Sequence, residues 1–249
     1  MKKILVLILL LGFCGPCFGG MLIGAGSTDA GGCSRSSVIF SEDFESDYVN
    51  GDEWSTQHSW TELTASSNVF TVTNSSPISD TYSGIVDNAG ATEDEVWIYN
   101  NFTALSSGYV TAEFKFNSAD VSGSVKLFAL SDGSPSSGGN RKIDLAVFNE
   151  NLYYQDNITD RSIASVSDAT EYTVALEINV SGSGANDIVR IWVNGTEITY
   201  DSSRSGYNTS SQGSPVGIDT IASRNETDAT AGDCKIDDII IYNGVYCAE

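Results

Sequence analysis

Basic residues are scarce in this sequence, and their scarcity excludes two classes of partner. The chain has 12 lysine and arginine residues against 33 aspartate and glutamate residues, so its formal net charge is −21. A field of this sign repels the nucleic-acid backbone and anionic membrane surfaces, so we expect neither nucleic acid nor membrane as a partner of the mature chain. A polyanionic glycan is disfavoured as well, unless a local basic patch or bound cations compensate the repulsion.

Histidine and closely spaced cysteines are equally scarce. His58 is the only histidine, so a two-histidine metal site is excluded and a catalytic triad could form at one place only. Outside the first 20 residues no two cysteines have the short spacing of a zinc site. We expect His58, in a polar stretch rich in turn residues, to be an ordinary surface residue.

Long apolar runs are absent except at the N-terminus. Residues 4–13 form a continuous apolar run behind Lys2 and Lys3, which is the pattern of a secretory signal peptide and is too short to span a bilayer comfortably. We predict a signal peptide over 1–19 and a flexible Gly/Ser-rich lead-in over 20–37. The mature protein is then extracellular or periplasmic, where disulfides are permitted.

A lipid anchor is not expected on the leader. Lipidation requires a small residue directly before the modified cysteine, whereas Phe13 precedes Cys14 and Pro16 precedes Cys17. We therefore interpret the chain as a secreted protein without an anchor.

The sequence from Val38 onward predicts one all-β domain, 38–249. Short segments that alternate apolar and polar residues recur, and clusters of Ser, Gly, Asn and Asp separate them. Along 109–116 this period of two puts Phe114 and Phe116 on one face and Glu113 and Lys115 on the other. Such strands bury one face each, so we predict an antiparallel β-sandwich of two sheets.

Four short segments carry a family resemblance. Residues 171–178 read EYTVALEI, 189–195 read VRIWVNG, 236–244 read IDDIIIYNG, and the opening segment 40–45 reads FSEDFE. Together they resemble the concanavalin A-like and laminin G-like jelly-roll superfamily, and the opening segment also resembles the start of MAM domains. The resemblance implies a jelly roll whose first and last strands pair. The superfamily includes lectins, adhesion modules, glycoside hydrolases and polysaccharide lyases, so it does not select a function.

Two carboxylate clusters predict a structural calcium site. The candidate ligands are Glu42, Asp43 and Glu45 on the first strand and Asp237 and Asp238 on the last. If these strands pair, hard oxygen ligands converge at one edge, and a cation would relieve their repulsion. Many modules of the resembled superfamily hold such a calcium. The alternative is that these carboxylates are solvated or accept hydrogen bonds from backbone amides.

Exposed strand faces supply the candidate ligand-binding residues, which are Trp192, Arg190, Lys126 and Tyr153. Aromatic rings with polar edges can stack on sugar rings, and the cations can hydrogen-bond hydroxyl or carboxylate groups. We therefore predict a lectin-like or adhesive protein that binds a glycan or another cell-surface ligand. We expect Trp97 and Tyr99, in contrast, to pack in the core.

The alternative is a polysaccharide-degrading enzyme, a hydrolase or a lyase. Its chemistry would need carboxylates on the open face of a sheet, and the candidates are Glu113, Asp144 and Glu177. The acidic strand motif of laminarinase-like hydrolases is absent, so a binding protein without catalytic residues is the preferred interpretation.

The mature chain keeps three cysteines, Cys33, Cys234 and Cys247. Cys234 and Cys247 flank the last strand and would be too far apart for a disulfide. We predict that Cys33 bridges either Cys247 or Cys234, which leaves one thiol over.

Overall fold

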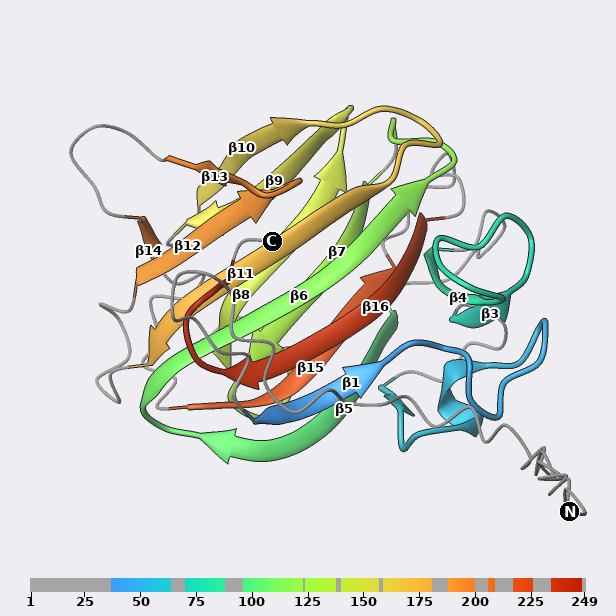
Figure 1. The fold of residues 1–249 in the computed structure, drawn as a ribbon, viewed down its shortest axis with the longest axis horizontal. Helices are drawn as coiled ribbons and strands as arrows, with labels where there is room; N and C mark the ends of the chain where they lie inside the picture. The colour runs from blue at the N-terminus through green and yellow to red at the C-terminus, as the bar shows by residue number, and fades with distance from the viewer. Residues whose placement is uncertain are drawn as a thin grey trace, which may run out of the picture.

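The protein is a sandwich of two antiparallel β-sheets, as the alternating segments predicted (Figure 1). The computed structural model describes residues 37–63, 70–87, 96–122, 124–137, 140–156, 159–180, 188–199, 206–208, 217–225 and 234–247. Within these ranges helical structure is limited to short 3-10 segments, of which η1 (Trp54–Thr56) is described in full. No helix in the described residues is long and apolar enough to cross a membrane.

The nine-stranded sheet faces the viewer in Figure 1 and contains both terminal strands. Its main order is β13 (Thr196–Ile198), β12 (Ile188–Val193), β11 (Tyr172–Val180), β6 (Gly108–Ser118), β16 (Cys234–Asn243), β4 (Ser83–Asp87) and β3 (Thr71–Thr73). Two further strands pair with members of this row, β1 (Val38–Glu42) with β16 and β14 (Tyr207–Asn208) with β12.

The seven-stranded sheet lies behind it. Its order is β10 (Thr159–Ser165), β9 (Asn151–Asp156), β8 (Arg141–Phe148), β7 (Ser124–Ser131), β15 (Ile218–Asn225), β5 (Val96–Leu105) and β2 (Thr61–Glu62). Neighbours such as β7 and β15, or β6 and β16, are far apart in the sequence, so the sandwich is held together by long-range pairing.

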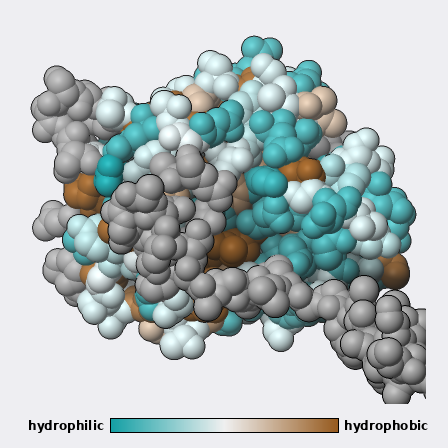
Figure 2. Space-filling view, in the orientation of Figure 1, coloured by the Kyte–Doolittle hydropathy of each residue, from teal (hydrophilic) through white to brown (hydrophobic). Residues whose placement is uncertain are grey.

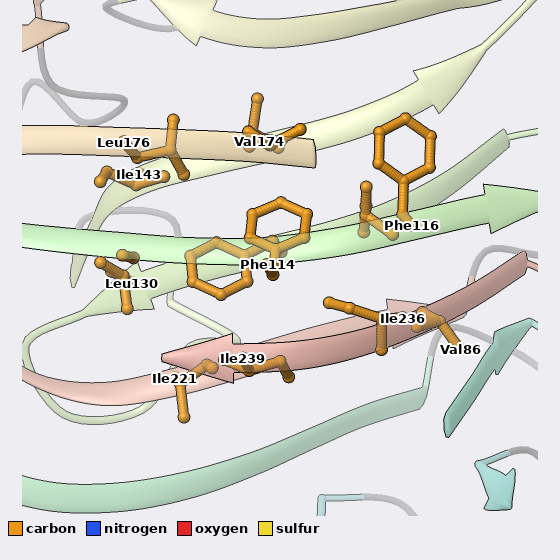
Figure 3. Close-up of a cluster of buried hydrophobic side chains, with 14 of the residues drawn as sticks. Val86, Phe114, Phe116, Leu130, Ile143, Val174, Leu176, Ile221, Ile236 and Ile239 are labelled. Atoms are coloured by element: carbon orange, nitrogen blue, oxygen red, sulfur yellow. The ribbon is translucent and has the colours of Figure 1, made fainter. Parts of the chain in front are cut away.

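The core fills the space between the sheets (Figure 3). Phe114 and Phe116 of β6 are buried, and the ring of Phe114 stacks on Phe128 of β7 with a centroid distance of 4.5 Å. Glu113 and Lys115 between them point to the outer face and are half-buried. The alternation along 109–116 therefore predicted the buried face of β6 correctly.

The first and last strands pair, as the resemblance implied. Phe40 lies opposite Ile241, Ser41 opposite Ile240 and Glu42 opposite Ile239. On its other side β16 pairs with β6, and this register is interrupted by a β-bulge between Asp237 and Ile240. The bulge shifts the alternation of side chains along β16, so Ile239 is buried and Ile240 is only half-buried.

Candidate functional site

A hollow on the outer face of the nine-stranded sheet, here named the β6–β16 pocket, has a volume of about 550 Å³. It lies where β1, β6 and the bulged part of β16 meet the turn after β12 and the C-terminal segment. Its polar lining residues include Asp43, Glu113, Lys115, Asn194 and Asp238, and its less polar ones include Ile239, Ile240 and Tyr246. Figure 2 shows hydrophobic surface near the centre of this face, bordered by hydrophilic residues.

Two side-chain pairs fix the polar lining of this pocket. Lys115 Nζ lies 2.9 Å from Asp238 Oδ2, and its hydrogen bond to Asp238 raises the pKa of the lysine. The buried Tyr242 hydroxyl donates to Glu113 Oε1 over 2.5 Å. Both carboxylates are therefore oriented by the protein itself, which lowers the entropy cost of presenting them to a ligand.

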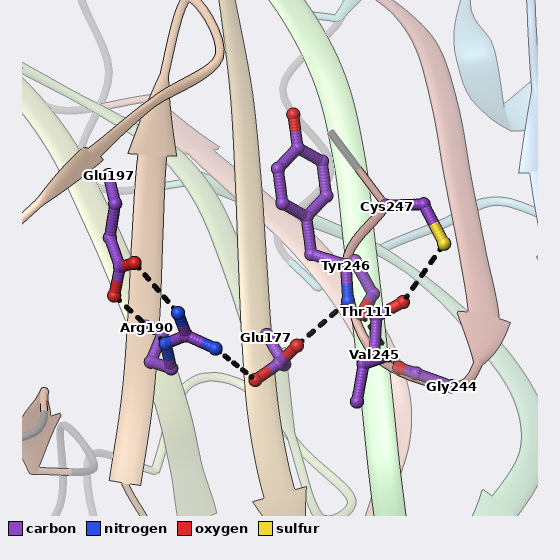
Figure 4. Close-up of polar contacts among 8 residues, drawn as sticks. All are labelled: Thr111, Glu177, Arg190, Glu197, Gly244, Val245, Tyr246 and Cys247. Atoms are coloured by element: carbon purple, nitrogen blue, oxygen red, sulfur yellow. Dashed lines mark hydrogen bonds and ion pairs between the residues drawn. The ribbon is translucent and has the colours of Figure 1, made fainter. Parts of the chain in front are cut away.

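The aromatic wall of the pocket comes from the C-terminal segment (Figure 4). The Tyr246 ring packs on Trp192 at a centroid distance of 4.4 Å, and the Tyr246 amide donates to Glu177 Oε2 over 2.8 Å. Arg190 lies over the Trp192 ring at 4.7 Å and pairs with Glu177 and Glu197. The segment thus covers Trp192, which is 7% exposed. The expectation of an exposed Trp192 was wrong, although it does lie on the outer face with Arg190.

The five carboxylates predicted to hold calcium do not gather. Alternation and the bulge send them in different directions, and each accepts hydrogen bonds from nearby protein groups. Only Glu42 lies in β1, and it accepts from Phe44 N and Trp60 Nε1. In the segment after β1, Asp43 accepts from Glu45 N, and Glu45 accepts from Thr81 N and Tyr82 N. The described residues contain no group of three or more acidic, histidine or cysteine side chains that could hold a metal ion. Calcium binding itself stays a prediction.

Asp237 and Asp238 illustrate this divergence. Asp238 faces outward to Lys115 and Ser79, whereas Asp237 is fully buried and accepts hydrogen bonds from Ser79 N, Ser83 Oγ and Asp238 N. Burial raises the pKa of Asp237 to about 7, and its hydrogen bonds from Ser83 and Asp238 oppose that shift. A carboxyl group in this setting changes its charge near neutral pH.

The three carboxylates proposed for catalysis do not share one groove. Glu113 and Glu177 lie on the nine-stranded sheet, where Glu177 is buried and paired with Arg190. Asp144 lies on the seven-stranded sheet, is buried, and lies 2.7 Å from Arg141 Nη1. Period-two alternation predicts which face of a strand a residue lies on, but not the sheet to which the strand belongs. The sequence therefore could not show whether these three carboxylates share one groove.

Lys126 and Tyr153 do come together, in a second hollow on the outer face of the seven-stranded sheet. This β7–β9 pocket has a volume of about 320 Å³, and its lining residues are Ser124, Lys126, Ala146, Phe148, Tyr153 and Asp160. Lys126 of β7 lies opposite Ala146 of β8, and Ala146 lies opposite Tyr153 of β9. These three neighbouring residues form the base of the pocket. The four predicted ligand-binding residues are thus divided between the two outer faces.

Sequence reasoning missed the environment of His58. Its Nδ1 lies 2.9 Å from Oε2 of the buried Glu42, and its ring packs edge-on against Tyr48. His58 is exposed, as expected, with 35% of its side chain accessible, but its backbone φ of 52° and its contact with Glu42 hold it in one place. No spacing in the sequence connects residues 42 and 58.

The structure decides one of the two disulfide alternatives. Cys234 is buried and is a thiol, which contradicts a bridge from Cys33 to Cys234. Cys247 is also buried, with Sγ 3.7 Å from the carbonyl oxygen of Val245 (Figure 4). Cys33 lies outside the described residues, so the bridge from Cys33 to Cys247 stays a prediction.

Comparison with known proteins shows a shared fold only. The sequence matches no protein-family profile and no curated protein. The receptor-binding domain of botulinum neurotoxin mosaic serotype C/D matches in structure with a TM-score of 0.52 and 14% identity, over 85% of this chain and 49% of that one. A sialidase matches with a TM-score of 0.51 and 10% identity, over 78% of this chain and 18% of that one. This chain therefore spans about half of the first protein and less than a fifth of the second, and what it shares with them is the β-sandwich fold.

Proposed function

We propose that this protein is secreted and binds a neutral glycan in the β6–β16 pocket. The observation that carries the proposal is the combination of an aromatic wall with oriented hydrogen-bonding groups in one hollow of about 550 Å³. A sugar ring has an apolar face and polar edges, so it needs a flat aromatic side chain beside carboxylate and amide groups. Tyr246 supplies the ring, and Glu113, Asn194, Asp43 and Lys115 supply the polar contacts.

The charge of the pocket favours a neutral ligand. Four acidic residues, Glu42, Asp43, Glu113 and Asp238, line it with only one lysine. Ionised carboxylates accept hydroxyl hydrogen bonds strongly but repel a second anion. The same fold occurs in a receptor-binding domain and within a sialidase, which supports recognition of a ligand on this scaffold without naming the ligand.

The test is a glycan-array screen of the mature protein, followed by calorimetry on the best neutral oligosaccharide. Glu113→Gln keeps an oxygen for the Tyr242 hydroxyl but weakens the acceptor, and Tyr246→Ala removes the aromatic wall. Each should weaken binding by about tenfold, the equivalent of roughly 1.4 kcal/mol. Glu150→Gln is the matched control, because Glu150 is exposed on the β8–β9 turn. Wild-type affinity in both pocket variants would refute the site.

A polysaccharide-degrading activity is the second candidate, favoured by one observation. Glu113 and Asp238 line the same pocket, and glycoside hydrolases use a pair of carboxylates on either side of the scissile bond. Incubation with a broad polysaccharide panel decides between the two functions. New reducing ends that disappear in Glu113→Gln would establish catalysis, and glycan binding without release would reject it.

We also propose that calcium, if bound, has a structural role beside this pocket, through the outward-facing Asp43 and Asp238. This part of the proposal rests on the hardness of carboxylate oxygen ligands.

A further inference from the structure

The outer face of the seven-stranded sheet concentrates positive charge in an otherwise acidic protein. Lys126 of β7, Arg141 of β8 and Arg224 of β15 lie around Trp97 of β5 and the buried carboxylate of Asp144. The guanidinium groups of Arg141 and Arg224 lie 5.3 and 5.1 Å from the Trp97 ring centre. Arg224 and Lys126 are direct cross-strand partners. Like charges opposite each other destabilise a sheet, and the Asp144 carboxylate offsets part of this repulsion through its ion pair with Lys126.

Asp144 pairs with two of these cations at once and with Lys126 at the longer distance. Arg141 Nη1 lies 2.7 Å from Asp144 Oδ2, whereas Lys126 Nζ is 3.5 Å from Oδ1, and neither contact has hydrogen-bond geometry. One carboxylate is thus shared by two cations, and Arg141 is the nearer one. Lys126 has three donor hydrogens, and its side chain also lines the β7–β9 pocket.

The remaining lining of the β7–β9 pocket suits a sugar ring. Phe148 is 40% exposed and its ring centre lies 6.1 Å from that of Tyr153, so two aromatic faces flank the pocket. Ala146 forms a low floor between them, and Asp160 of the edge strand β10 provides an acceptor at the rim. The pocket therefore has a cation at one position, aromatic surface across its middle, and an acceptor for hydroxyl groups.

We infer that the β7–β9 pocket is a second binding site, specific for a carboxylated sugar such as a uronic acid residue of a glycan. The carboxylate of the sugar pairs with Lys126, the ring packs against Phe148 and Tyr153, and a hydroxyl group donates to Asp160. This site is separate from the β6–β16 pocket, since it lies on the other sheet and takes an anionic ligand instead of a neutral one.

The experiment compares matched ligands on the full mature chain. Calorimetry with a uronic acid oligosaccharide, its methyl ester and the neutral oligosaccharide of the same length tests the charge of the ligand without altering the protein. We expect the free acid to bind about tenfold or more tightly than the other two, with the preference shrinking as salt is added. Acetate carries a carboxylate but no sugar ring, so it tests whether the pocket recognises the ring as well as the charge. It should bind far more weakly than the free acid. Equal affinity for acid and ester, or for acetate and the sugar acid, would overturn the inference.

Two variants place the site. Lys126→Gln should abolish the preference for the acid while leaving weak neutral binding, and Phe148→Ser should weaken acid and ester alike. Phe148→Ser leaves the ion pairs intact, so it keeps the inference testable if loss of Lys126 disturbs the buried Asp144. Lys235→Gln is the control, because Lys235 lies on the nine-stranded sheet and binds the carbonyl groups of Ser75 and Ser76. An acid preference that survives in Lys126→Gln would refute the assignment. Glu113→Gln should not change binding of the acid. The proposed site in the β7–β9 pocket can therefore be refuted independently of the proposed site in the β6–β16 pocket.

Discussion

Raising the pH from 5 to 8 should destabilise this protein through one buried carboxyl group. Asp237 has no exposed surface, and burial raises its pKa from 3.8 to about 7 in the folded protein. In the unfolded chain its pKa returns to the ordinary value near 3.9. Between these values the folded state holds a proton that the unfolded state has released. The stabilisation is therefore complete below about pH 4 and is lost as the pH rises through 7.

The magnitude follows from the size of the shift. One pKa unit corresponds to about 1.36 kcal/mol, so a shift of roughly three units gives about 4 kcal/mol in total. Roughly a third of this is already lost at pH 5, which leaves on the order of 2–3 kcal/mol between pH 5 and pH 8. Domains are typically stable by only about 5–15 kcal/mol, so the effect should be readily measurable.

The assay is urea unfolding at pH 5, 6, 7 and 8 in the presence of a chelator, for the wild-type protein and two variants. Asp237→Asn cannot ionise, so its free energy of unfolding should lose this pH dependence, whatever the substitution costs at pH 5. Asp120→Asn is the control, because the hydrogen bonds from Ser122 lower the pKa of Asp120 and keep it ionised throughout. If Asp237→Asn retains the wild-type slope, the carboxyl group is ionised in the folded state and the reasoning fails.

Three further predictions concern stability and the ends of the chain. If calcium binds only the folded state, the melting temperature should rise by the equivalent of ~2.7 kcal/mol at a hundredfold excess over the dissociation constant, and a melt that chelator leaves unchanged would exclude a structural calcium. Peptide mapping without reducing agent should yield a Cys33–Cys247 peptide, with the buried Cys234 alkylated only after unfolding, and recovery of all three as thiols would reject the bridge. Gly84→Ala should destabilise by about 1–3 kcal/mol in a thermal melt, since its added Cβ would lie 2.6 Å from the Phe44 ring and closer still to Trp54, and wild-type stability would show that this corner repacks freely.

Local alternation determined much of the fold from sequence alone. The residues along β6 predicted which side of the strand is buried, and the terminal motifs predicted that the segments around Phe40 and Ile241 lie side by side. The buried side of β6 follows from the period of a strand. The pairing of the terminal segments was implied by the family resemblance. The sequence also identified Lys126 and Tyr153 as outward-facing residues, and both line one pocket.

Only the tertiary structure decided which outward-facing residues meet. Glu113 and Asp144 both alternate outward, yet they lie on opposite sheets because strand order follows from long-range pairing. Trp192 is covered by Tyr246, which lies 54 residues further along the chain, and no periodicity predicts that a C-terminal segment will fold back over a sheet. The bulge in β16 separates the directions of Asp237 and Asp238, so adjacent carboxylates that suggested one cation site became one buried group and one ion pair. Alternation is a property of a single strand, whereas a binding site depends on which strands the folded chain brings together.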